Sequence, residues 1–167
     1  MNIFVLRHGI AVELGSPGIT RDSDRTLTPK GERKVWQVAD AVAAMEICFQ
    51  LILTSPYARA RQTAEIVADA LGAKKKLEET EHLTPGGSIK RLIEYIRGIK
   101  PAPESVLLVG HEPYLSELVS VLMAGDTSAA VMMKKGGLCK LSAETLTDGR
   151  CATMEWLLTP KQMALMA

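Results

Sequence analysis

The sequence predicts an α/β protein built as a three-layer sandwich, in which helices flank a mostly parallel central sheet. Up to residue 123, short apolar runs alternate with segments of helical periodicity, an order typical of parallel sheets. Beyond that point two strand-like runs flank Asp148-Gly149, a turn pair typical of an antiparallel hairpin at a sheet edge. The length of 167 residues fits one domain, taken as residues 1–167.

The N-terminal third of the chain predicts one strand, one long loop and one helix. Residues 2–6 form a compact apolar run rich in β-formers, which indicates a buried strand. Residues 7–27 are polar, and loops this long in compact domains are often functional. Thr28 and Pro29 have the character of an N-cap and first helical residue, so we expect a helix from there to about Met45.

The next elements repeat this alternation. Residues 50–53 predict a second strand, and Ser55-Pro56 is expected to cap a helix that runs to about Leu71. Residues 77–79 indicate at most a weak edge strand.

The second half of the chain continues the pattern and then departs from it. The unbroken apolar run at residues 105–109 is typical of a strand buried on both faces of a parallel sheet. One helix is expected on each side of this strand, at residues 89–99 and 114–123. Two antiparallel strands are expected after them, at residues 138–141 and 152–158.

Composition narrows the class of function. The net charge of +1 gives no global argument for binding nucleic acid or an acidic membrane surface. No segment approaches the ~20 consecutive apolar residues that a membrane-spanning helix needs. The three cysteines have no metal-ligand spacing and no partner pattern, so neither a zinc site nor a disulfide framework is indicated. We expect a cytoplasmic protein with no cofactor, no metal and no nucleic-acid or membrane partner.

Three polar clusters directly follow predicted strands: residues 7–9, 55–63 and 110–111. Because the carboxyl ends of parallel strands meet at one edge of a sheet, we expect these clusters to converge. Together they supply two arginines and two histidines: Arg7, His8, Arg59 and His111. Guanidinium groups match phosphate oxygens and stay charged, while histidine serves as a nucleophile or proton donor near neutrality. The set therefore predicts a site for a phosphoryl dianion.

These residues also carry a resemblance. Four motifs in this order resemble the histidine phosphatase superfamily over residues 1–123: Arg7-His8-Gly9, Leu27-Thr28-Pro29-Lys30-Gly31, Ser55-Pro56-Tyr57-Ala58-Arg59-Ala60-Arg61-Gln62-Thr63-Ala64 and Gly110-His111. Three further features are similar to the SixA-type phosphohistidine phosphatases: Ile10-Ala11 after the first motif, the loop 22–25, and Leu83-Thr84-Pro85-x-Gly87. The resemblance implies a phosphoglycerate mutase-like fold.

The resemblance also implies roles for individual residues. His8 would be the nucleophile and must be neutral to attack, which Arg7 and Arg59 should favour by like-charge repulsion. Arg7 and Arg59 would hold the phosphoryl oxygens, and His111 would be a third donor. Gly9 would let the backbone approach the phosphate. Two arginines on the first loop are further substrate-binding candidates: Arg21 and Arg25.

A proton donor is harder to assign. The phosphoglycerate mutase branch carries an acidic residue on a longer insertion before the third helix, whereas this chain has only residues 78–83 there. Glu79, Glu81 and His82 are the candidates.

The resulting hypothesis is a metal-independent phosphatase that acts on phosphohistidine in a protein, such as a histidine phosphotransfer domain in signalling. The alternative enzyme is a phosphomonoesterase for a small phosphorylated metabolite. A phosphate-binding module without turnover would not need His8. A metal-dependent hydrolase built on His8 and His111 lacks paired carboxylates at ligand spacing.

Overall fold

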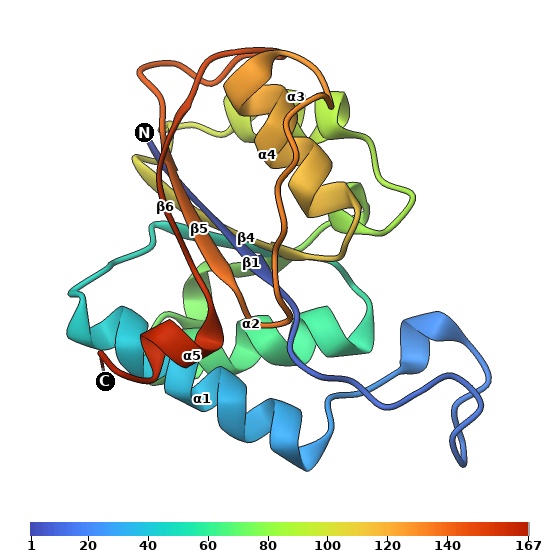
Figure 1. Ribbon diagram of the computed structural model, residues 1–167. Helices are drawn as coiled ribbons and strands as arrows, with labels where there is room; N and C mark the ends of the chain where they lie inside the picture. Colours follow the sequence, from blue (N-terminus) through green and yellow to red (C-terminus); the bar gives the residue numbers. More distant parts are fainter. Residues whose placement is uncertain (167) are drawn as a thin grey trace.

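The computed structural model describes residues 1–166, and a twisted six-stranded sheet lies at its centre (Figure 1). The strand order is β3-β2-β4-β1-β5-β6. Neighbours among the first four strands in this order pair in parallel, and β5 and β6 are antiparallel to their neighbours. The strands are β1 (Asn2–Arg7), β2 (Leu51–Thr54), β3 (Leu77–Glu79), β4 (Ser105–Gly110), β5 (Leu138–Ser142) and β6 (Thr153–Leu158). This confirms the predicted fold class, the weak edge strand and the hairpin.

Helices cover both faces of the sheet (Figure 1). One face packs against α1 (Pro29–Ala44), α2 (Ala58–Ala70) and α5 (Pro160–Met163). The other packs against α3 (Ile89–Gly98) and α4 (Tyr114–Ala124). The result is the three-layer arrangement that the alternation of strands and helices predicts.

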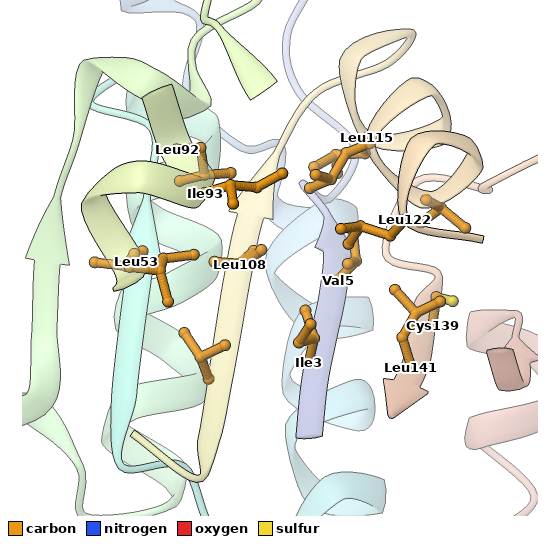
Figure 2. Close-up of a cluster of buried hydrophobic side chains, with 14 of the residues drawn as sticks. Ile3, Val5, Leu53, Leu92, Ile93, Leu108, Leu115, Leu122, Cys139 and Leu141 are labelled. Carbon is orange, nitrogen blue, oxygen red and sulfur yellow. The ribbon is translucent and has the colours of Figure 1, made fainter. Parts of the chain in front are cut away.

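The two hydrophobic cores follow from the alternation of side chains along each strand. In β1, Ile3 and Val5 belong to the core under α3 and α4, whereas Phe4 and Leu6 belong to the core over α1 and α2. Figure 2 shows the first of these cores, where strand side chains meet Leu92 and Leu115 from the covering helices. Each fully buried aliphatic side chain contributes about 1.5–3 kcal/mol, so the central strands form a rigid support.

The helix beginnings differ in how well local sequence predicts them. Thr28 caps α1 as expected, since its side chain accepts a 3.0 Å hydrogen bond from the Gly31 amide. The expectation for Ser55-Pro56 is wrong: α2 begins at Ala58 and Tyr57 is its N-cap residue. Ser55 ends up outside the helix because it still continues the β2 pairing, through a 3.0 Å bond from its amide to Val109.

The register of the sheet brings three strand ends level with one another. Arg7 of β1 pairs with Gly110 of β4, and Thr54 of β2 pairs with Val109 of β4. The residues that follow these strands therefore leave the sheet at the same edge. Within residues 1–166, no helix combines the length and the apolar character that crossing a membrane requires.

Candidate active site

His8 is the first residue after β1 and is 6% exposed. Its Nδ1 lies 2.7 Å from the carbonyl oxygen of Gly9, and its Nε2 lies 3.2 Å from Nε of Arg59. A carbonyl can only accept and a guanidinium N–H can only donate, so Nδ1 carries the ring proton and Nε2 presents its lone pair. The partners thus fix the tautomer in which Nε2 is the unprotonated ring nitrogen and accepts a hydrogen bond from Arg59.

The surroundings of His8 keep its ring neutral. Burial is the largest cause and lowers the pKa of His8 to about 3, although the hydrogen bond to Gly9 opposes this. The charges of Arg59 and Arg7 lower the pKa further, in the direction that like-charge repulsion predicts. A neutral imidazole at physiological pH is the form that can attack phosphorus.

Arg59 lies in the first turn of α2 and is 4% exposed. Besides its contact with His8, it donates to Asp22 twice: from Nη1 to the backbone oxygen at 2.6 Å and from Nη2 to Oδ2 at 2.9 Å. Its guanidinium also lies over the ring of Tyr57, 5.3 Å from the centroid. These contacts hold the guanidinium beside Nε2 of His8 with little freedom to turn.

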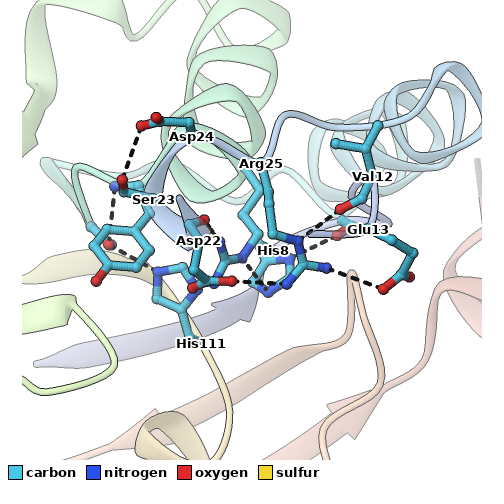
Figure 3. A network of polar contacts seen from close by, with 12 residues as sticks. His8, Val12, Glu13, Asp22, Ser23, Asp24, Arg25 and His111 are labelled. Carbon is cyan, nitrogen blue, oxygen red and sulfur yellow. Dashed lines mark hydrogen bonds and ion pairs between the residues drawn. The ribbon is translucent and has the colours of Figure 1, made fainter. Parts of the chain in front are cut away.

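Asp22 connects the first loop to the site, and sequence reasoning missed it. Its Oδ1 accepts from Nη1 of Arg25 at 2.9 Å, while Nε of Arg25 donates to Val12 at 2.7 Å (Figure 3). Burial disfavours the ionised form of Asp22, but hydrogen bonds from Arg25 and Arg59 outweigh it and lower the pKa of the carboxyl group. Asp22 is therefore an anion, and the Asp22-to-Arg25 spacing was the only sequence signal for it.

The two loop arginines have different positions. Arg25 pairs with Asp22, which in turn contacts Arg59, and the Arg25 side chain is 18% exposed. The Arg21 side chain is 76% exposed and pairs with Asp24 at 2.9 Å, so the structure does not bring it into contact with the histidines or with Arg59.

Arg7 is the last residue of β1 and directly precedes His8. Its Nη1 donates to the carbonyl of Met133 at 2.8 Å, and its buried Nε has no partner among the described residues. The amide of Gly136 bonds to the carbonyl oxygens of Arg7 and His8, at 3.0 and 3.1 Å. The segment before β5 therefore holds the end of β1, a contribution that nothing in the local sequence indicated.

His111 follows β4 and is 2% exposed, with its ring centroid 5.1 Å from that of His8. Its Nε2 lies 2.9 Å from Oγ of Ser55, and its buried Nδ1 has no partner in the described chain. Burial first, and then the charge of Arg59, lowers the pKa of His111 to about 3. The second histidine is therefore also neutral.

Gly9 is required for the packing of the first motif against α1. A Cβ atom at Gly9 would lie 2.7 Å from Cγ2 of Val35 on α1 and 3.1 Å from Cδ2 of Leu27. Its amide donates to Oγ1 of Thr63 at 3.1 Å, and that hydroxyl donates to the Arg59 carbonyl at 2.7 Å. Gly9 and Thr63 thus join the first motif to α2.

The two glutamates expected as proton donors are exposed, whereas a glutamate that was not expected has a buried carboxylate oxygen. Glu79 is exposed and lies 3.9 Å from Arg61, and Glu81 is also exposed. Glu112 follows His111 directly: its Oε2 accepts from the Ser116 hydroxyl, while its buried Oε1 has no partner among the described residues. Sequence reasoning overlooked Glu112 because its neighbour Pro113 suggested only a turn into α4. Among residues 1–166, no group of three or more metal-ligating side chains comes together.

An open α/β sheet with two buried histidines and two arginines at the carboxyl edge of its strands defines a class of protein, the enzymes that handle phosphoryl groups. Residues 3–84 match the Histidine phosphatase superfamily (branch 1). The chain belongs to the histidine phosphatase superfamily and is similar to SixA proteins over nearly its whole length.

Relatives cover nearly the whole chain. An uncharacterized protein of Picosynechococcus sp. is 38% identical over 143 residues, 84% of each chain. Phosphohistidine phosphatase SixA of Escherichia coli (strain K12) is 28% identical over 162 residues, 96% of this chain and 94% of that one. The structure of the protein histidine phosphatase SixA complexed with tungstate superposes with a TM-score of 0.83 at 27% identity, covering 96% of this chain and 98% of the other.

Proposed function

We propose that this protein is a phosphohistidine phosphatase that works through a covalent intermediate on His8. The observation that carries the proposal is the forced tautomer of His8: Nε2 offers a lone pair while Arg59 stands 3.2 Å away. A nitrogen held neutral beside two guanidinium groups suits attack on an anionic phosphoryl group better than phosphate binding alone.

The reaction would proceed in two displacements at phosphorus. Nε2 of His8 forms a bond to phosphorus, and the bond to the leaving group breaks with its electron pair going to that group. Water then attacks the phosphohistidine, the P–N bond breaks back to His8, and the water proton leaves with the phosphate or with solvent. Arg7, Arg59 and His111 would hold the phosphoryl oxygens through both steps, which is most of what phosphoryl transfer requires.

The substrate we propose is phosphohistidine on a signalling protein, such as a histidine phosphotransfer domain. Protonated phosphohistidine departs as neutral imidazole and needs little help from an acid. The relative SixA of Escherichia coli is named a phosphohistidine phosphatase, and the solved SixA structure holds tungstate, an oxyanion similar to phosphate. We also propose that the enzyme works without a metal and in the cytoplasm.

One observation favours the alternative, a phosphomonoesterase for a small phosphorylated metabolite. An alkoxide leaving group needs a proton donor, which contributes roughly 10²–10⁴-fold. Glu112 follows His111 in the chain, its Oε1 is buried without a partner among the described residues, and it interacts electrostatically with Arg7. Glu112 is therefore the candidate for that donor.

Two measurements test the proposal. The first is kcat/KM for a phosphohistidine peptide, p-nitrophenyl phosphate and a phosphoserine peptide, with and without excess chelator. We expect phosphohistidine and the aryl phosphate to be preferred and the chelator to have no effect. Phosphoserine turnover equal to that of phosphohistidine would favour the phosphomonoesterase.

The second measurement is mass spectrometry of rapidly quenched enzyme. Acid-labile phosphate should appear on His8 of the wild type. His8→Ala should bind vanadate but show no turnover, and measurable turnover by this variant would contradict the covalent mechanism.

A further inference from the structure

We propose that Ser55 is a positioning residue that sets the tautomer of His111, placing its single ring proton on Nδ1 for donation to a phosphoryl oxygen. The inference rests on the proposed function in one respect, because it takes a phosphoryl group as the ligand of His111. It does not depend on which phosphorylated substrate the enzyme prefers.

The first step is the inventory of bonds at the Ser55 hydroxyl. Ser55 is fully buried, at 0% exposed, and its Oγ accepts a hydrogen bond from the amide of Tyr57 at 3.3 Å. A hydroxyl group has one proton to donate. Within the described chain, the acceptor that lies in reach of this proton is Nε2 of His111, at 2.9 Å. The geometry therefore makes Ser55 the donor and Nε2 the acceptor.

The second step concerns the other ring nitrogen. Burial and the neighbouring arginines keep His111 neutral, so the ring has one proton, and if Nε2 accepts then Nδ1 carries it. Nδ1 is buried without a partner in the described chain, and an unpaired buried donor costs about 1–3 kcal/mol. A ligand oxygen would satisfy it.

The third step is the position of the ring. Figure 3 shows the His111 ring beside Asp22 and His8. Nε2 of this ring lies 2.9 Å from Oγ of Ser55. The ring centroids of His8 and His111 are 5.1 Å apart, so a phosphoryl group on Nε2 of His8 would be within reach of His111. In the opposite tautomer Nδ1 would turn a lone pair toward anionic oxygens, which would repel them.

Nitrogen-15 NMR of the histidine rings tests this directly, since the chain has only three histidines to assign. Protonated and unprotonated ring nitrogens have well-separated shifts. We expect Nδ1 of His111 to be protonated and Nε2 unprotonated in the wild type, both free and with vanadate bound. A wild-type spectrum with the proton on Nε2, or with both nitrogens protonated in the vanadate complex, would overturn the proposal whatever the substrate proves to be.

Variants separate positioning from mere packing. Ser55→Ala should shift His111 toward the Nε2–H tautomer and lower kcat for p-nitrophenyl phosphate by about tenfold, as loss of an orienting partner does at metal-bound histidines. Ser55→Thr keeps the hydroxyl, so it should keep the wild-type tautomer of His111 and the wild-type kcat. The matched control is Ser120→Ala on α4. It removes another buried hydroxyl, which donates to the Asp126 carbonyl at 2.6 Å and accepts from the Ala129 amide at 3.0 Å. An unchanged tautomer in folded Ser55→Ala would contradict the inference, and if that variant does not fold, the wild-type spectrum decides.

Discussion

Nε of Arg59 donates a hydrogen bond to Nε2 of His8 across 3.2 Å, joining α2 to the end of β1. The nucleophilic lone pair and the guanidinium that would bind the phosphoryl group are thus in contact before substrate arrives. In the proposed attack, this Arg59 N–H would switch its hydrogen bond from Nε2 of His8 to a phosphoryl oxygen, and the helix would not need to move. Such preorganised donors cost no rearrangement at the moment of reaction.

Arg59→Ala should lower kcat/KM by roughly 10²–10³-fold, the loss expected when one preorganised donor is removed. Steady-state kinetics with p-nitrophenyl phosphate measure this. The control is Arg61→Ala on the same helix, because the Arg61 side chain is 45% exposed and pairs with Glu65 at 3.7 Å. Arg61→Ala should change the rate by less than about threefold. An equally small effect at Arg59 would show that the second motif does not reach the phosphoryl group.

Asp22→Asn should separate binding from turnover. The Asp22 carboxylate holds Arg59 and Arg25 but also repels an incoming dianion. Its neutralisation should strengthen vanadate inhibition by about threefold or more, since such a repulsion is worth on the order of 1 kcal/mol. We expect kcat to fall by about tenfold because Arg59 is less firmly oriented.

Asp24→Asn is the matched control for this prediction. Asp24 lies in the same loop but bonds to Arg21, whose side chain is 76% exposed. Vanadate inhibition and kcat of Asp24→Asn should therefore stay near their wild-type values. Weaker vanadate binding in Asp22→Asn would mean that the carboxylate helps to build the oxyanion site instead of competing with the ligand.

Glu112→Gln should affect substrates according to their leaving group. If the free Oε1 donates a proton, phosphoserine turnover should fall at least about 10²-fold, while phosphohistidine turnover should change little. The measurement is kcat/KM for both peptides, with Glu117→Gln, an exposed position on α4, as the control. Equal losses for both peptides would assign Glu112 a role through Arg7 instead of as an acid.

The two buried histidines should make stability depend on pH. Burial lowers the pKa of both His8 and His111 from 6.5 to about 3, so between these values the unfolded chain binds protons that the folded protein excludes. The free energy of unfolding should therefore fall as pH drops from about 6.5 toward 3, by up to about 1.4 kcal/mol per pH unit for each histidine.

Urea denaturation at pH 6.5 and pH 5 tests this sign. His111→Asn should reduce the loss over this interval by about 1.6 kcal/mol relative to wild type. A pH dependence that is identical in His111→Asn would show that His111 titrates normally in the folded protein.

Local patterns determined the elements of this protein from sequence alone. The helix after Thr28, the edge strand at residues 77–79 and the hairpin each follow from caps, periodicity and turn residues, which act over a few residues. The convergence of Arg7, Arg59 and the two histidines could also be anticipated, because parallel strands end at a common edge.

Tertiary structure alone determined which side chains contact one another in the site. The Arg59–Asp22 contact joins residues 37 apart, and the His111–Ser55 contact joins residues 56 apart. Neither has a local signature: Ser55 looks like a helix cap, and Asp22 looks like an ordinary acidic loop residue. Their partners are set by sheet register and by where the first loop folds back on α2. Long-range packing fixes these positions, and it does so only once the whole chain has folded.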